Sequence, residues 1–222
     1  MKTALAAFLF ALAWLAAVRA TEPQEQAALR QIEATRAANW DDYTACMHPL
    51  ALAKFKASMT PVGDAALASK TPSAKNILER VFANQDLEKL KALPPAEFFK
   101  TFMQNWAAKN PVFVKTMKNS SVEMIGHVME GGNRAHVVFR KGVEAGGQKI
   151  TTVDVVSLEK DGNEWKCLLS DEMENLAASL MRQIKASDAA KPKPEPPPKP
   201  APATPAPATP APAAPKPAPA AK

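Results

Sequence analysis

Between residues 21 and 110, apolar residues stand three or four positions apart, the spacing that places side chains on one face of a helix. Helices are predicted over 25–38, from Asn39 to a break at His48-Pro49, and over 50–59, 74–83 and 95–109. The last of these has four aromatic residues on one side, which is typical of a buried helix face. Residues 60–73, which contain Pro, Gly and Ser, predict a loop.

The second half of the chain changes to the alternating pattern that is typical of strands. Turn dipeptides at Gly131-Gly132, Gly146-Gly147 and Asp161-Gly162 separate β-branched runs, which predicts a four-stranded antiparallel meander. A last helix is predicted over 171–185. The expected fold is therefore α+β: N-terminal helices packed on one face of a four-stranded or larger curved antiparallel meander, plus a C-terminal helix.

The three turns also predict which strand residues face one another. With each dipeptide at the centre of its turn, His127 lies opposite His136, and Phe139 lies opposite Asp154. The third turn then places Cys167 on the same face as Asp154. One face is apolar except for Asp154, and a slip of one residue would exchange the two faces.

The two ends of the chain differ from its middle. Residues 1–20 combine Lys2, an apolar run and small residues before Thr21, which predicts a secretory signal and export to the periplasm or the extracellular space. The apolar run is shorter than the ~20 residues of a membrane span, so the protein is not expected to span a membrane. Residues 188–222, rich in Pro, Ala and Lys, predict a disordered spacer tail. The domain is expected over 21–187.

The positive charge of the chain belongs mainly to these ends. Of the formal net charge of +6, Lys2 and Arg19 contribute +2 and residues 188–222 contribute +3, which leaves +1 for residues 21–187. A nucleic-acid-binding domain carries its positive charge on the fold. Nucleic acid is therefore not an expected partner.

Three segments carry a resemblance to a known family. They are Asn39-Trp40-Asp41-Asp42-Tyr43 with Met47-His48-Pro49, then Gly132-Asn133-Arg134-Ala135-His136-Val137, and Lys160-Asp161-Gly162-Asn163-Glu164-Trp165-Lys166. In this order they resemble the nuclear transport factor 2-like and SnoaL-like superfamily of cystatin-like α+β cones, over residues 24–170. The helical stretch over 58–110 is longer than compact members need, and the last helix is extra.

The resemblance implies a pocket between the helices and the concave face of the sheet. Some members of the superfamily use this pocket for catalysis, and many bind ligands there. Ketosteroid isomerase-like members use a carboxylate as the general base, and sheet-to-sheet dimers are common in the superfamily.

Asp154 is the candidate residue for chemistry in such a pocket. A carboxylate on an apolar face must be paired, protonated or hydrated, and desolvation there would raise its pKa towards that of a general base. Tyr43, Asp42 and His48 are the candidate partners across the pocket. The alternative is a structural role, in which Asp154 bonds a helix N-terminus or a lysine, or lies at a hydrated strand end.

His127 and His136, if directly opposite, would be close enough to share a metal ion. A third ligand is missing from the predicted rows, so the simpler reading is a pair of exposed cross-strand neighbours. No metal or other cofactor is predicted. The sequence has no CxxC pair, phosphate-binding loop or nucleophile elbow.

Cys46 and Cys167 are the two cysteines of the chain. In an oxidising compartment an even pair predicts a disulfide, and Cys167 is expected to face the helix that carries Cys46. Two buried free thiols, or one reactive thiol, are the alternatives.

An apolar row is predicted on the sheet face opposite the helices; its members are Ile125, Val138, Val155 and Leu168. Soluble monomers avoid bare patches of this kind, so either the last helix or a second copy of the chain should cover it, and a homodimer is favoured.

The function favoured is a non-enzymatic, exported binding or interaction domain. Its tail would act as a spacer within the cell envelope or would contact polymers of the envelope. The alternative is a lyase, isomerase or hydrolase of small molecules that uses a pocket around Asp154.

Overall fold

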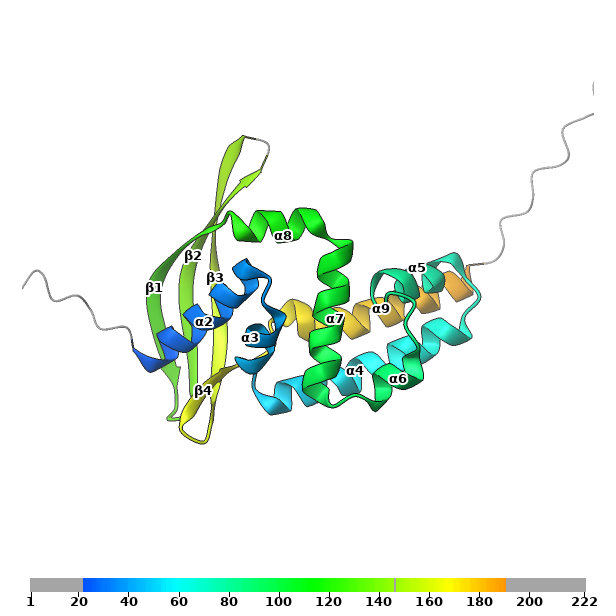
Figure 1. The fold of residues 1–222 in the computed structure, drawn as a ribbon, viewed down its shortest axis with the longest axis horizontal. Helices are drawn as coiled ribbons and strands as arrows, with labels where there is room; N and C mark the ends of the chain where they lie inside the picture. The colour runs from blue at the N-terminus through cyan, green and yellow to red at the C-terminus, as the bar shows by residue number, and fades with distance from the viewer. Residues whose placement is uncertain (1–21, 146, 191–222) are drawn as a thin grey trace, which may run out of the picture. The chain divides into compact units, whose positions relative to one another are not determined.

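The computed structural model of the chain describes residues 22–145 and 147–190. The predicted signal over 1–20 and residues 191–222 of the predicted tail lie outside these residues. Residues 188 and 189, which were predicted to belong to the disordered tail, are part of the last helix. Figure 1 shows the α+β fold, with helices before and after a four-stranded antiparallel sheet in the order β1-β2-β3-β4. The described elements are α2 Pro23–Ala37, α3 Trp40–Ala45, α4 Pro49–Ala68, α5 Pro72–Arg80, α6 Leu87–Ala92, α7 Pro95–Lys109, α8 Pro111–Lys118, β1 Ser121–Glu130, β2 Arg134–Ala145, β3 Gln148–Asp161, β4 Glu164–Cys167 and α9 Asp171–Ala189.

Prolines set the starts of many of the helices. A proline occupies the first position of α2, α4, α5, α7 and α8. At this position the backbone N–H has no partner within the helix, so proline loses nothing by lacking it, and its fixed φ is that of a helix. The predicted break at His48-Pro49 and the predicted helix over 95–109 are confirmed.

Helix α4 continues through Pro61, so the predicted loop over 60–73 is wrong. Met59, Val62 and Ala66 are fully buried at helical spacing, and they extend the apolar stripe of the preceding turns. Pro61 lies on the exposed side of the helix. Burial of the larger two, Met59 and Val62, stabilises the helix by about 1.5–3 kcal/mol each. This offsets the ~3 kcal/mol that a proline costs in a helix interior.

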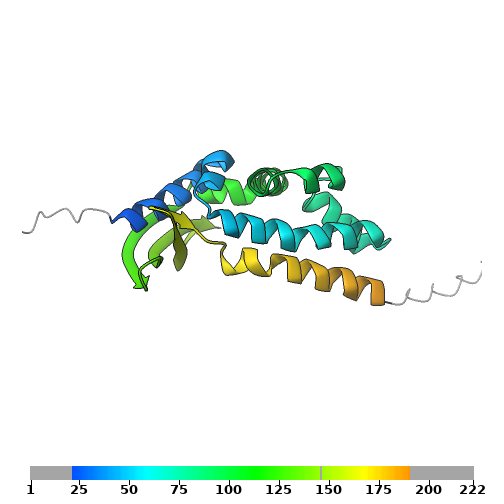
Figure 2. The ribbon, with the colours of Figure 1, turned by 90° about the horizontal axis from the view of Figure 1, so that it is seen from below.

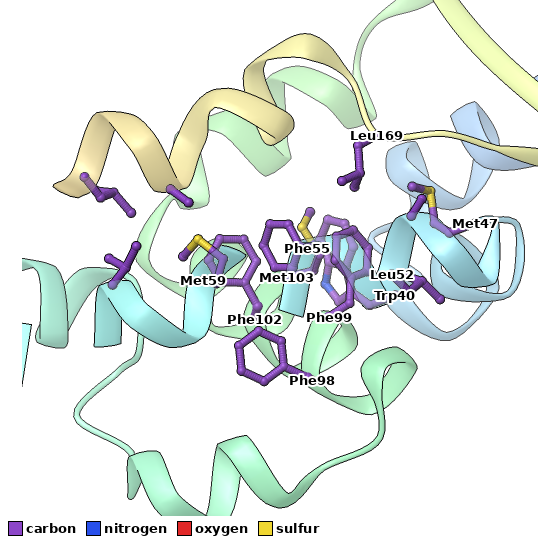
Figure 3. Close-up of a cluster of buried hydrophobic side chains, with 14 of the residues drawn as sticks. Trp40, Met47, Leu52, Phe55, Met59, Phe98, Phe99, Phe102, Met103 and Leu169 are labelled. Atoms are coloured by element: carbon purple, nitrogen blue, oxygen red, sulfur yellow. The ribbon is translucent and has the colours of Figure 1, made fainter. Parts of the chain in front are cut away.

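The sheet and the helices share one core. Ala135, Val137, Leu158 and Cys167 are fully buried on one face of the sheet, where α2 lies across the strands and α8 contacts β2 (Figure 1). The other helices lie beside the sheet, around α4 and α7. The centre of this helical layer is Phe55, whose ring lies 4.9 Å from that of Phe102 (Figure 3).

Helix α9 runs along α4 in this layer (Figure 2). Its buried face contains Ala177, Leu180 and Ile184. Polar contacts join both ends of α9 to α4. Lys54 of α4 pairs with Glu174 at 2.8 Å, and the hydroxyl of Ser69, the C-cap of α4, donates to Asp188 at 2.6 Å. The last helix therefore belongs to the helical layer. None of the described helices is long and apolar enough to cross a membrane.

The junction between α3 and α4 is bonded to the edge of the sheet. Met47 forms a parallel bridge with Cys167. The N–H of Cys167 donates to the carbonyl of Cys46, and the N–H of His48 donates to the carbonyl of Cys167, both at 2.8 Å. Because Cys167 and His48 are buried, their backbone groups need hydrogen-bond partners, and the bridge supplies them. It fixes where α4 leaves the sheet.

The second hairpin has the predicted register, with Phe139 opposite Asp154. The third is shifted by two residues, because Gly162-Asn163 forms the turn and Asp161 pairs with Glu164. A shift of two leaves every side chain on its predicted face, so Cys167 still faces the helices.

The first hairpin departs from its predicted register at a β-bulge. Met124 lies opposite Phe139 as expected, but the next pair is Gly126 with Val138, so the register moves by one. Gly126 has a φ of 155°, a conformation that is open to glycine and rarely to other residues. The bulge exchanges the faces of the rest of β1.

Replacing Gly126 tests this account of the bulge. We expect Gly126→Ala to lower the free energy of unfolding by about 1–3 kcal/mol, because a side chain strains this backbone conformation. Gly132→Ala is the matched control, since a Cβ there would meet nothing within 4 Å and its φ is not positive. Urea denaturation measures both, and an equal effect of the two substitutions would contradict the account.

Candidate functional site

Asp154 lies on the helix-facing side of β3, where it was predicted. Its carboxylate pairs with the ammonium group of Lys141 on β2, and both side chains are partly exposed. A hydrated pair of this kind contributes about 1 kcal/mol or less. Among the described residues, no hydrogen bond or ion pair joins Asp154 to Tyr43, Asp42 or His48. The polar cluster expected around Asp154 is therefore not formed.

Tyr43 and His48 each have a clear structural place. The ring of Tyr43 stacks on Phe99 with 5.8 Å between centroids, and burial is the main cause that raises the pKa of Tyr43 to about 12. The phenol therefore stays protonated at neutral pH. His48 is the N-cap of α4, where its Nδ1 accepts the N–H of Leu50 at 3.2 Å.

The predicted pairing of His127 with His136 is wrong. Glu130 pairs with Arg134, so the register from the turn to the bulge differs by one residue from the predicted register. His127 is opposite Val137, and Val128 is opposite His136. The two histidines thus lie on opposite faces of the sheet and cannot share a metal ion. Within residues 22–145 and 147–190, no group of three or more His, Cys, Asp or Glu side chains is placed to hold a metal.

The bulge turns His127 towards the first turn of α2, where Gln24 and Glu25 hold it. Nδ1 of His127 lies 2.8 Å from Oε1 of Glu25, and Nε2 lies 2.6 Å from the amide nitrogen of Gln24. The side chains of His127 and Glu25 are 16% and 5% exposed. Because the amide nitrogen is a donor, Nε2 accepts, and the ring proton on Nδ1 is donated to the carboxylate.

A histidine that is oriented by a carboxylate is an arrangement used in general acid–base catalysis. That chemistry needs the other ring nitrogen open to a substrate, whereas Gln24 occupies it here. No hydroxyl or thiol group of the described residues forms a hydrogen bond with His127. The Gln24–Glu25–His127 cluster therefore acts as a buried polar tie between α2 and β1.

This cluster was not predicted from the sequence, although a signal for it exists. A glycine inside a strand often marks a bulge, and Gly126 directly precedes His127. A bulge at that position moves His127 to the helix-facing side. The partners on α2 follow only from the three-dimensional packing.

Cys46 and Cys167 lie next to each other, joined by the backbone hydrogen bond of the edge bridge. Both are free thiols in the structure; Cys167 is buried and Cys46 half-buried. Burial is the main cause that raises the pKa of both thiols. A raised pKa reduces the fraction of reactive thiolate, so neither thiol is set up as a nucleophile. The disulfide between them stays a prediction.

Two open cavities lie away from the expected pocket. The α2–β4 groove, about 530 Å³, is bounded by α2, α3 and β4 and includes Ala27, Ala34, Ala45 and Trp165. The second, about 510 Å³, lies where α7 and α8 meet the turn before α3. Neither is lined by Asp154, Tyr43 or His48. The sequence patterns predicted neither of them.

Comparison with known protein families, curated proteins and solved structures gave no match. The resemblance to nuclear transport factor 2-like domains therefore stays a prediction.

The two histidines provide a matched pair of mutations. We expect His127→Ala to lower the free energy of unfolding by about 1–3 kcal/mol, because it removes a buried partner of Glu25 and Gln24. His136 lies on the outer face of the sheet, where its partly exposed ring bonds Ser157 and Glu130. Its replacement by Ala is expected to cost about 0.5 kcal/mol or less. Denaturant unfolding compares the two, and a smaller loss for His127→Ala would show that the cluster does not tie α2 to the sheet.

The predicted disulfide is tested by counting thiols. After treatment with a small disulfide oxidant, the denatured protein is expected to contain no free thiol from Cys46 or Cys167. Reduction should then lower stability by up to ~4–5 kcal/mol in the loop-entropy model. The Cys46→Ser variant, which cannot form the bond, serves as the control. Two free thiols after oxidation would exclude the disulfide.

Proposed function

We propose that the protein is a non-enzymatic, exported interaction domain whose contact surface is the outer face of its sheet. The observation that supports this most is a set of exposed aliphatic side chains on that face. Val128, Val153 and Val155 are 63%, 60% and 53% exposed, and Ile125 at the bulge is 45% exposed. We call these four residues, with half-buried Val138 between them, the outer apolar patch.

The patch lies in the middle of the sheet. Val155 pairs with Val138, and Val153 pairs with Arg140 on the neighbouring strand. Helix α9, which could have covered this face, packs against α4 and α5. Contiguous aliphatic surface of this kind is typical of an interaction site. Each side chain that becomes fully buried would contribute about 1.5–3 kcal/mol.

A second copy of the chain is the partner that this surface fits best. Two antiparallel sheets pack face to face with their strands nearly aligned, and a two-fold axis brings the same patch of both copies together. Charges at the edge of the patch occur in matched pairs. Glu123 pairs with Arg140 at 2.6 Å, and Glu159 pairs with Arg134 at 2.9 Å. A surface with balanced charges does not repel its own copy.

The ends of the chain complete the proposal. The signal over 1–20 would export the protein to the periplasm or the extracellular space. The Pro- and Lys-rich segment over 191–222, which follows α9, would act as a spacer and would contact acidic polymers of the cell envelope.

Concentration-dependent sedimentation tests the proposed dimer. We expect the protein to sediment as a dimer at micromolar concentration, and Val155→Lys to sediment as a folded monomer, because a charge would be buried at the interface. Leu67→Lys is the control, since Leu67 is similarly exposed but lies on α4. A wild-type monomer at all concentrations would overturn the proposal, as would equal dissociation by both substitutions.

A further inference from the structure

The α2–β4 groove exists because small side chains face one another across it. Ala27, Ala34 and Ala37 lie at helical spacing along α2, and Ala45 ends α3. Trp165 of β4 forms the opposite wall. The resulting volume of about 530 Å³ falls in the range of 300–1,000 Å³ that is typical of small-ligand sites.

Charges of both signs stand at the rim of the groove. Lys166 is already engaged: its ammonium group lies 2.8 Å from Glu164 and 3.1 Å from the carbonyl oxygen of Ala45. Arg30 and Glu33, one turn apart on the exposed side of α2, form no ion pair with another described residue. Asp42, whose carboxylate accepts a hydrogen bond from the amide of Asn39, adds a third carboxylate at the α3 side.

This distribution of charge limits the ligand. A polyanion would be repelled by Glu33, Asp42 and Glu164, and a simple cation would be repelled by Arg30 and Lys166. A ligand with one carboxylate and one ammonium group matches both. The alanines and the indole of Trp165 suit an apolar body between the two charged ends. The ammonium group of Lys160 lies over the Trp165 ring in a cation–π contact, 5.2 Å from the ring centroid.

We propose that the α2–β4 groove binds a short peptide with free termini and an apolar side chain. Arg30 binds the carboxylate terminus in a two-pronged contact that suits a guanidinium group. Glu33 and Asp42 bind the ammonium terminus, and the side chain packs against Trp165. The volume of the groove admits a di- or tripeptide. The site does not depend on the outer apolar patch, so the groove and the dimer can fail separately.

Isothermal titration calorimetry with the dipeptide Ala-Leu and the tripeptide Ala-Leu-Ala tests the site. We expect saturable binding of at least one of the two peptides. Its N-acetylated, C-amidated analogue should bind at least ~10-fold more weakly, because it lacks both charges. Absence of binding by both free peptides up to about ten millimolar, well above the ~1 mM that corresponds to weak binding, would overturn the proposal. So would equal binding of the free and the blocked peptide.

Two substitutions then locate the binding. Arg30→Gln is expected to weaken it at least ~10-fold, through loss of the charged contact with the carboxylate. Arg182→Gln, at an exposed arginine of α9, should leave binding unchanged. Both positions lie at the surface, and circular dichroism verifies that both variants are folded. Equal affinities of the two variants would place the peptide outside the groove.

A thiol probe gives an independent readout, because Cys46 lines the groove. In the reduced protein with Cys167→Ser, bound peptide should slow the reaction of Cys46 with a thiol reagent. Unchanged reactivity at a peptide concentration that saturates binding would also place the peptide elsewhere.

Discussion

The backbone link between Cys167 and the α3–α4 junction is the constraint on which the layout of the domain depends. The carbonyl of Cys46 and the N–H of His48 both bond Cys167, so this short segment extends the sheet by one parallel bridge. Because the link lies at a buried position, losing it would leave polar backbone groups without partners. It directs α4 away from the sheet and places Cys46, which lines the α2–β4 groove, beside Cys167.

Sequence periodicity was sufficient for the α+β class, for most of the helices and for the meander. It succeeded where burial and spacing agree, as in the helix over 95–109 and in the pairing of Phe139 with Asp154. It failed at Pro61, where the local preference of one residue opposed the burial of a longer stripe. Local preference is a weak force beside the burial of several side chains.

The candidate site was harder to predict than the fold, because its parts are far apart in sequence. One extra residue at the bulge, Ile125, moved His127 from the outer face of the sheet to the buried one, and no helix or strand pattern records that change. The partners of His127 lie about a hundred residues earlier on α2. The groove depends on alanines, whose small side chains leave space. In the sequence these cannot be told apart from alanines that are present because they favour a helix.

The way in which α9 is fastened has a mechanical consequence. A force applied through residues 191–222 would reach the domain at the C-terminal end of α9. Contacts near both ends of that helix, Lys54 with Glu174 and Ser69 with Asp188, lie on either side of its buried apolar face. A pull along the helix axis would therefore load the whole seam with α4 in shear, and its contacts would have to break together. Tension that entered the domain at the end of α9 would thus be carried by the seam between α9 and α4.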